Sequence, residues 1–371
     1  MSKTTIFDKD EALVFSAEVS KEVATAIKEA LEAKGQSYAD ALLDIPLKKA
    51  EGHTLQRATI FSAALESHGI DWRAHVRVAA SIELLVASMY LHNRIFDNKG
   101  GIDFSKNPTI GRHAIAGNLC RELACGMMSS ETDSRKERIL RWSSEIFDYG
   151  QYLAYESAKG FDLPVHRCDS AMIMLRRAYC INAAYYQGIG ALAAAVAGAG
   201  VAETSRLTKW CVAYGMLVQF VNDIADFTPP SFNEATVEKV PTDAFSDYRK
   251  RELSLVLHKL IHSGGNLSSE EACLQSAGRL GALASSMQLC HDIARCLGGE
   301  AATKGLGLMG NMAFLGISNR YFKDIWSMKR RKEIEWGAVT DALENQLISG
   351  IVMHTQERLW ETLPAHLKPK F

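Results

Sequence analysis

The amino-acid sequence predicts an all-α protein, and three observations support this fold class. Apolar residues recur at intervals of three and four positions along most of the chain, which is the period of an amphipathic helix. Alternating runs of β-branched residues, the pattern of half-buried strands, are hard to find. Only eight prolines interrupt the 371 residues. We therefore expect a large helical bundle.

The expected helices lie between likely loops, and several exceed the average length of helices in globular proteins. Prolines mark these loops at Pro46, Pro108, Pro164, Pro229, Pro230, Pro241, Pro364 and Pro369. The helical segments predicted between them are 75–97, 113–128, 135–158, 169–199, 204–227, 249–263 and 270–297.

The composition predicts a single domain, because no linker separates two segments of different composition. After Phe322 the chain changes to a charged stretch followed by one amphipathic helix. We predict a helical domain over residues 1–321 and a C-terminal helical extension of the same domain over residues 322–371.

The overall composition is that of a globular protein with almost no net charge. Hydrophobic residues make up 47% of the chain, and 42 basic residues nearly balance 43 acidic ones, so nothing indicates a nucleic-acid partner. Eight cysteines without CxxC pairs predict buried free thiols in a reducing compartment. The N-terminus does not resemble a signal peptide, and the alanine-rich run 189–201 is too short for a membrane span. We expect a cytoplasmic protein without an integral membrane span.

Two acidic stretches carry the candidate chemistry: "LHNRIFDNKG" at 91–100 and "LVQFVNDIADF" at 217–227. Residues four apart share a face of a helix, so each stretch aims an amide and a carboxylate in one direction. Such oxygens, with waters and substrate phosphate oxygens, hold Mg²⁺, and two facing helices of this kind can clamp a diphosphate. The alternative for an isolated D-x-x-D is a set of surface acidic residues. The candidate metal ligands are Asn93, Asp97, Asn222, Asp223 and Asp226, of which Asp97, Asp223 and Asp226 are also the candidate catalytic residues.

The first stretch resembles a known family. "ELLVASMYLHNRIFDN" is similar to the segment "ELIHAASLIHDDIMDN" of the trans-isoprenyl diphosphate synthases, with Glu83, His92 and Asp97 in register. The family's aspartate-rich DDxxD motif stands here as "NRIFD". The second stretch, "YGMLVQFVNDIADF", resembles the family's "LGLAFQIVDDILDL": Gly215 and Gln219 coincide, as do both aspartates, and an asparagine replaces the first aspartate.

Further motifs follow in the family's order. "PTIGRHAIAGNLCRELA" and "YGQYLAYE" resemble two middle motifs, and "EKVPTDAFSDYRKRELSL" loosely matches a later one through Lys239, Asp247 and Leu255. The resemblance spans about residues 40–321, and the tail extends past the family's usual end. It implies a class I isoprenoid synthase helical bundle around a deep central cavity, a prenyl diphosphate substrate, Mg²⁺ and a homodimer.

This chain departs from the family where the family binds its second substrate. "EGHTLQR" stands in place of "GGKRLRP", so His53, Thr54 and Gln56 replace basic residues, although Arg57 is one step away. A charge-assisted hydrogen bond contributes roughly 1.5–3 kcal/mol, so losing two weakens that site by about two to four orders of magnitude. The departures therefore argue against ordinary chain elongation.

The candidate substrate-binding residues come from the same resemblance. Arg94 occupies the position of the second aspartate and could contact the diphosphate as a fixed charge. Arg176 and Arg177 lie near the family's Lys-Thr pair, and the alternative for them is a helix surface. Gln219 and Lys239 match family positions, and Met89 stands where the family sets cavity depth.

Three functions remain open at this point. The first is a Mg²⁺-dependent class I terpene synthase-like enzyme that ionises a linear C15–C20 prenyl diphosphate and cyclises or quenches the cation. The second is a prenyltransferase, acting by chain elongation or by transfer to a non-diphosphate acceptor. The third is a catalytically silent partner subunit of an active prenyl diphosphate synthase, for which the loss of first-motif aspartates is the argument.

Overall fold

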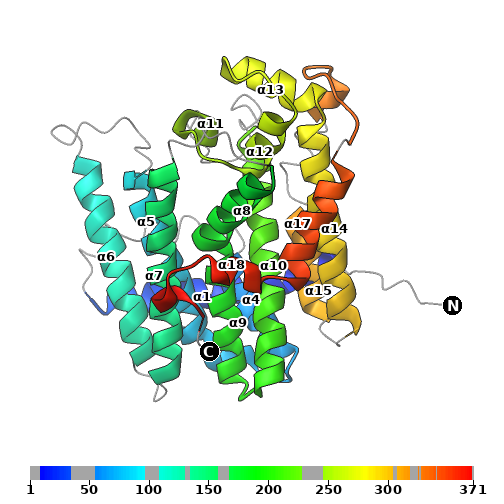
Figure 1. Ribbon diagram of the computed structural model, residues 1–371. Coiled ribbons are helices and arrows are strands. Elements are labelled where there is room, and N and C mark those ends of the chain that lie inside the picture. The colour runs from blue at the N-terminus through cyan, green and yellow to red at the C-terminus, as the bar shows by residue number, and fades with distance from the viewer. Residues whose placement is uncertain are drawn as a thin grey trace.

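The structure is a computed structural model, drawn as a ribbon in Figure 1. It describes residues 9–34, 55–96, 108–129, 134–157, 167–227, 245–303, 307–317, 325, 327–339 and 341–369. Within these ranges the regular elements are helices, and no strand occurs. The predicted all-α fold class is confirmed.

The helices are named in chain order. They are α1 (Lys9–Glu32), α4 (Gln56–Glu66), the short η1 (Trp72–His75), α5 (Val76–Phe96), α6 (Pro108–Ser129), α7 (Ser134–Ser157), α8 (Arg167–Ala178), the π-helical η3 (Tyr179–Ala183), α9 (Ala184–Val196), α10 (Val201–Ala225), α11 (Ser246–Lys250), α12 (Leu255–His262), α13 (Glu270–Arg279), α14 (Ala282–Thr303), α15 (Gly307–Ile317), α17 (Ala342–His354), α18 (Glu357–Glu361) and η5 (Ala365–Leu367).

Three predicted helices are each broken by a local backbone feature. The segment 169–199 contains the π turn η3, which joins α8 to α9. The segment 249–263 breaks where Arg251 takes a left-handed φ of 57°, and 270–297 breaks at Gly281 with φ 73°. A left-handed residue ends a helix because its backbone cannot continue the right-handed spiral.

The central helix α10 packs closely on the π turn. A Cβ at Gly215 would lie 2.6 Å from the backbone Cα of Ala183, so only glycine allows this approach. The side-chain amide of Asn182 donates to the carbonyl oxygen of Gly215 at 2.9 Å. This contact fixes α10 against the end of α8, and π turns of this kind often occur at functional sites.

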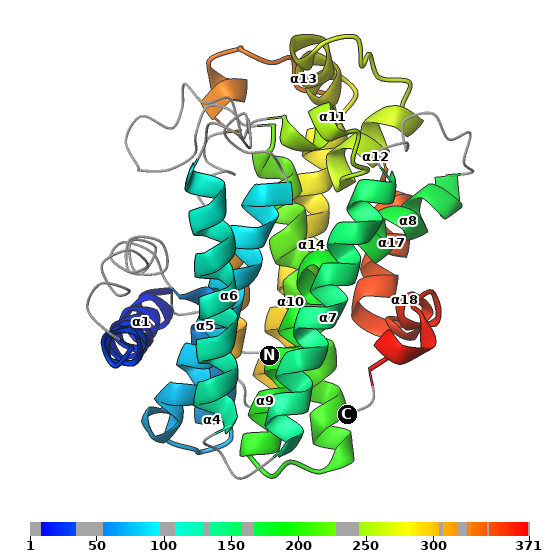
Figure 2. The same cartoon turned by 90° about the vertical axis from the view of Figure 1, so that its left-hand side faces the viewer.

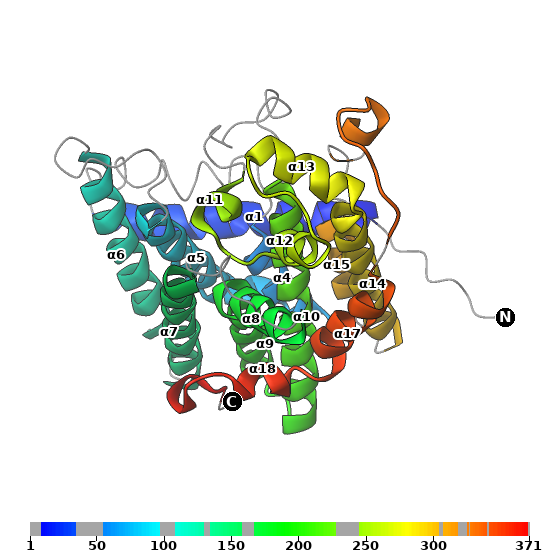
Figure 3. The same cartoon turned by 45° about the horizontal axis from the view of Figure 1, so that its top comes forward.

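The bundle surrounds α10, which packs against α9, α14 and α12. Figure 2 shows α5 and α6 side by side on one flank, and α7, α9 and α10 on the other. The C-terminal ends of α5 and α10, which carry the two acidic stretches, lie at the same end of the bundle. Figure 3, tilted to bring that end forward, shows α11, α12 and α13 covering it.

The C-terminal segment packs back onto the bundle. Helix α17 lies against α14 and α10, and the indole N–H of Trp142 on α7 donates to the carbonyl oxygen of Leu367 at 3.0 Å. The side-chain amide of Gln356 donates to the carbonyl oxygen of Lys209 on α10 at 2.8 Å. The boundary at residue 321 stays a prediction.

One apolar segment has the length and composition of a membrane span. Trp72–His92 has a mean hydropathy of 1.3, and 61% of it is buried inside the bundle. Core packing on α6, α4 and α1 explains this apolarity, since these helices contact α5 directly.

The cysteines whose placement is described have free thiols. Five of them are buried, Cys125 is partly exposed and Cys296 is exposed. Burial raises the pKa of the Cys120 thiol to about 12, so this thiol stays protonated and unreactive. The predicted buried free thiols are confirmed for these five.

Candidate functional site

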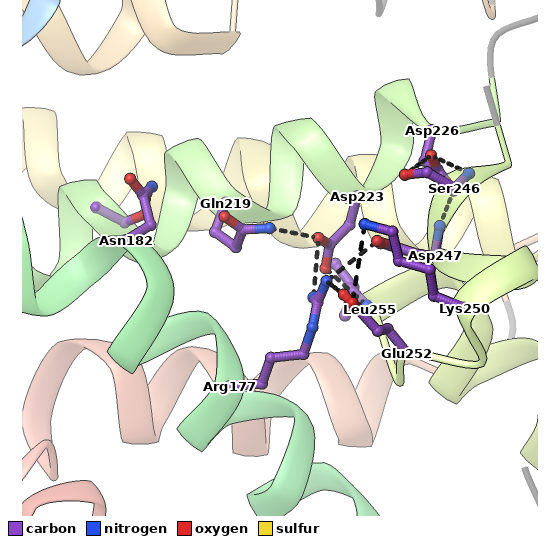
Figure 4. Close-up of polar contacts among 11 residues, drawn as sticks. Arg177, Asn182, Gln219, Asp223, Asp226, Ser246, Asp247, Lys250, Glu252 and Leu255 are labelled. Carbon is purple, nitrogen blue, oxygen red and sulfur yellow. Dashed lines mark hydrogen bonds and ion pairs between the residues drawn. The ribbon is translucent and has the colours of Figure 1, made fainter. Parts of the chain in front are cut away.

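A buried acidic cluster lies where α10 ends against α8, α11 and α12 (Figure 4). Arg177 comes from the last turn of α8, Asp223 from α10, Asp247 from α11, and Glu252 from the turn before α12. We call these four residues the Arg177 cluster. Asp226, one turn beyond Asp223, lies beside it.

Asp223 is held by donors from three helices. One carboxylate oxygen accepts from the side-chain amide of Gln219 at 2.8 Å, and the other accepts from the backbone N–H of Leu255 at 2.8 Å. The guanidinium of Arg177 lies 3.6 Å from the first oxygen. Only 1% of Asp223 is exposed, so these contacts replace the water that an aspartate normally binds.

Arg177 is the central cation of the cluster. Its guanidinium donates to Glu252 at 2.6 Å and to Asp247 at 3.1 Å. Burial alone would lower the pKa of Arg177, but the charges of Asp247, Glu252 and Asp223 outweigh it and raise the pKa further above its ordinary value. Arg177 is therefore permanently charged and engaged with the protein's own carboxylates.

Asp226 fixes the start of α11. Its two oxygens accept from the backbone N–H of Ser246 at 2.9 Å, the hydroxyl of Ser246 at 3.0 Å and the backbone N–H of Asp247 at 3.2 Å. This carboxylate acts as a cap, because the first amide groups of a helix have no partner within it.

Negative charge is in excess here, and the carboxyl pKa values reflect it. Burial raises the pKa of Asp223 to about 7, even though Arg177 opposes the shift. Burial and the charge of Asp247 raise the pKa of Asp226 to about 8. Burial also raises the pKa of Asp247. Three carboxyl groups thus share the buried guanidinium of Arg177, with Asp226 beside them, and Lys250 lies 3.9 Å from Glu252.

The polar residues of the second acidic stretch differ in their burial. Asn222 is exposed, whereas Asp223 and Asp226 are buried. Each oxygen of the two carboxylates already accepts at least one protein hydrogen bond. Among the described residues, no group of three or more His, Cys, Asp or Glu side chains is placed to hold a metal ion. As arranged, Asp223 and Asp226 do not fit a metal ion, and metal binding by this stretch stays a prediction.

Several predicted residues lie outside the described part of the chain. Asp97 and Lys239 fall outside the described ranges, and so do the side chains of Asn93 and Arg94. Their predicted roles as metal and diphosphate ligands stay predictions.

The other predicted substrate-binding residues have defined positions. Gln219 is buried and donates to Asp223, Arg177 lies in its cluster, and Arg176 is partly exposed. Met89 is 4% exposed and packs in the core on α5. Their substrate contacts stay predictions.

Of the polar residues in "EGHTLQR", Gln56 and Arg57 lie in the described part of the chain, in a partly buried polar network. The amide of Gln56 donates to the hydroxyl of Tyr214 at 2.6 Å and accepts from the hydroxyl of Tyr186 at 3.2 Å. Arg57 lies 5.7 Å from the ring centroid of Tyr186. Glu83 accepts from the backbone N–H of Ala58 at 2.8 Å and so caps α4.

Sequence reasoning found part of the cluster. The loose match to a family motif singled out Asp247 and Leu255, without placing them, and the structure brings both beside the second acidic stretch. It did not identify Glu252 or Ser246. The available signal was the pair of carboxylates in "SDYRKREL", which follows the second acidic stretch in the chain.

Among the comparisons with known proteins, only the one with solved structures finds matches, and it supports the fold. Neither a protein-family model nor a curated protein sequence matches this chain. Among solved structures, a polyprenyl synthase from Caulobacter crescentus CB15, complexed with calcium and isoprenyl diphosphate, aligns with a TM-score of 0.69 at 17% identity, over 86% of this chain and 100% of that one.

Two further structures align in the same way. A decaprenyl diphosphate synthase from Rhodobacter capsulatus has a TM-score of 0.67 at 17% identity, over 84% of this chain and 99% of that one. A heptaprenyl diphosphate synthase from Staphylococcus aureus has a TM-score of 0.67 at 14% identity, with the same coverage. The chain therefore has the all-α fold of polyprenyl synthases, which the motif order predicted.

Proposed function

We propose that this chain is a prenyltransferase that binds a linear prenyl diphosphate and transfers its prenyl group. The observation that carries the proposal is the shared end of α5 and α10, on a fold that solved polyprenyl synthases share. These helices bear the two stretches that resemble the family's aspartate-rich motifs. Prenyl transfer requires two helix ends close together, because groups on both sides must bind the diphosphate as it leaves the prenyl group.

The positive charge that such a reaction needs has few candidate sources among the described residues. Arg177 is neutralised by Asp223, Asp247 and Glu252, so it supports the acidic end of α10 rather than a leaving diphosphate. Arg176 is partly exposed on the neighbouring position, and Arg94 remains the candidate from the first stretch. A bound Mg²⁺ ion would add charge at the diphosphate, and exposed Asn222 is the member of the second stretch best placed to approach it.

The acceptor in this proposal has no second diphosphate. Gln56 stands where the family has an arginine, and both ends of its amide are used by Tyr214 and Tyr186. A neutral acceptor would need no cationic pocket at that place. Cyclisation or quenching of the cation, the terpene synthase hypothesis, is the finer alternative, although the solved neighbours are named as prenyl diphosphate synthases.

Substrate incubation separates these reactions. The purified chain is mixed with farnesyl or geranylgeranyl diphosphate and Mg²⁺, with and without isopentenyl diphosphate and with a neutral aromatic acceptor, and the products are read by mass spectrometry. A prenylated neutral acceptor supports the proposal. A longer diphosphate, formed only with isopentenyl diphosphate, would support prenyl transfer but overturn the neutral acceptor. A hydrocarbon or alcohol formed from the allylic substrate alone would overturn it in favour of terpene synthase chemistry.

Asn222 offers the sharper variants for this assay. Because Asn222 is exposed, Asn222→Ala should leave folding intact and lower activity, and Asn222→Asp should retain it. Asp223→Ala and Asp226→Ala are less informative, since their loss also removes contacts to α12 and α11.

The hydrogen bonds within the Arg177 cluster favour a second candidate function, that of a catalytically silent subunit. The carboxylates of this cluster are hydrogen-bonded within the protein, so they need neither a metal ion nor a substrate as a partner. Co-purification with an active prenyl diphosphate synthase, together with no turnover of any allylic diphosphate alone, would support this role. A homodimer and a cytoplasmic location remain predictions, and sedimentation of the purified chain tests the first.

A further inference from the structure

A second buried charged cluster lies where the C-terminal helix α17 meets α12. Lys259 on α12 is fully buried, and its ammonium group donates to Asn345 at 2.8 Å, to Ser285 at 3.0 Å and to Glu344 at 3.2 Å. Three partners match the three N–H donors of a lysine. The Lys259 cluster, as we name it, consists of His258, Lys259, Ser285, Glu344 and Asn345.

Glu344 binds two consecutive residues of α12. One of its oxygens accepts from Lys259, and the other lies 2.8 Å from Nε2 of His258. Nδ1 of the same imidazole lies 2.9 Å from the hydroxyl of Ser170 on α8. A carboxylate only accepts, so the imidazole carries hydrogen on Nε2 and can accept the Ser170 hydroxyl proton at Nδ1. The C-terminal extension thus holds α12 through two charge-assisted contacts.

The other end of α12 reaches the acidic end of α10. Leu255, the first residue of α12, donates its backbone N–H to Asp223 at 2.8 Å. The turn before it carries Glu252, which binds Arg177. Helix α12 has eight residues, so His258 stands about one turn from Leu255. One short rigid element therefore links Glu344 to Asp223.

We propose that α17 is a positioning element for the acidic end of α10. Glu344 fixes α12, and α12 in turn keeps Leu255 on Asp223 and Glu252 on Arg177. A buried lysine is costly unless it is paired, and an apolar tail helix would pack without one. The Lys259 cluster instead gives α12 one defined position, which is what the Leu255 contact requires. This role does not depend on which reaction the chain catalyses.

Hydrogen exchange at Leu255 tests the proposal. In Glu344→Gln the amide group offers Lys259 and His258 one acceptor oxygen instead of two. We expect the Leu255 amide to exchange faster by on the order of tenfold or more, while amides in the middle of α10 keep their protection. The matched control is Glu357→Gln, in the same extension, whose carboxylate is 49% exposed beside Lys209. It should leave Leu255 unchanged.

A double variant keeps the test decisive if Glu344→Gln folds poorly. Lys259→Met with Glu344→Gln removes both charges together and leaves the single amide oxygen at position 344 free for His258, so stability and Leu255 protection should both recover. The proposal is wrong if Leu255 keeps wild-type exchange in folded Glu344→Gln. It is also wrong if exchange rises equally in α5, α10 and α12, because that pattern indicates global destabilisation.

Discussion

The Arg177 cluster contacts α12 through Leu255, and the Lys259 cluster includes two residues of α12, but the two clusters differ in their balance of charge. The Lys259 cluster pairs one ammonium with one carboxylate and completes itself with neutral partners. The Arg177 cluster sets three carboxylates against one guanidinium, with Asp226 beside them. The first is a closed structural contact, whereas the second keeps negative charge in excess inside the protein.

Perturbed carboxyl groups occur in and beside the Arg177 cluster. Asp223, Asp226 and Asp247 all have raised pKa values, because burial and mutual repulsion favour the protonated form. Such perturbation is a feature of functional sites. The guanidinium of Arg177 offsets part of this negative charge.

The largest expected effect comes from removing the cation of the unbalanced cluster. Arg177→Met leaves Asp223, Asp247 and Glu252 buried without their partner. We expect the free energy of unfolding at pH 7 to be about 3–5 kcal/mol lower than in the wild type. Urea denaturation measures this. Arg176→Met, at the partly exposed neighbour, is the control and should change stability by less than about 0.5 kcal/mol.

The same variant shows whether Arg177 stands in for a metal ion. We expect millimolar Ca²⁺ or Mg²⁺ to raise the melting temperature of Arg177→Met more than that of the wild type, since vacated carboxylates bind hard cations. If the wild type is stabilised by Mg²⁺ and Asp223→Asn abolishes this, Arg177 does not replace the metal.

The balanced cluster should respond less strongly. Lys259→Met leaves Glu344 without its ammonium partner but still beside His258, so we expect a loss of about 3 kcal/mol, at the lower end of the range for a broken buried pair. Lys259→Met with Glu344→Leu should recover most of it. Equal losses in the single and double variants would indicate that packing, not charge, holds α17.

Stability should fall with rising pH because burial, together with the charge of Asp247, raises the pKa of Asp226. Its pKa is about 8 in the folded protein, against an ordinary value of 3.8 for an exposed aspartate, so the folded state binds more protons between these values. This contribution is full below about pH 4 and lost as pH rises through about 8, with a slope of roughly 1.4 kcal/mol per pH unit per proton. Unfolding from pH 5 to 9 should give a flatter profile for Asp226→Asn. Parallel profiles would refute the assignment.

The smallest effect is expected at the surface of the same C-terminal extension. Lys209 and Glu357 form an ion pair with both side chains more than a third exposed. Solvent screens such pairs, so Glu357→Gln should change the free energy of unfolding by less than about 0.5 kcal/mol. A loss of stability close to that of Lys259→Met would mean that burial does not explain the difference between the buried and the exposed ion pair.

Much of the fold could be predicted from the sequence. The periodicity placed α5 and α10 within a few residues of their observed bounds, since a long apolar period is a strong local signal. The breaks at Arg251 and Gly281 were missed. Gly281 could have been found from its residue type, but Arg251 could not, because arginine rarely takes a left-handed conformation.

The candidate site could be predicted only in part. The spacing of "NDIAD" identified the acidic end of α10, and the motif match singled out Asp247 and Leu255 without indicating that they lie beside it. The spacing did not reveal that Asp223 and Asp226 turn inward, or that Arg177 would bind the protein's own carboxylates. Those facts depend on contacts between helices distant in the sequence.

The sequence by itself determined the helices, their order and the residue types brought to the end of α10, because helical periodicity and motif spacing are local properties. Only the tertiary structure decided the partners of each charge. Arg177 meets Glu252 across 75 residues, and Lys259 meets Asn345 across 86. These contacts matter for stability because a buried charge is costly unless it is paired, and the fold determines which partner lies beside it.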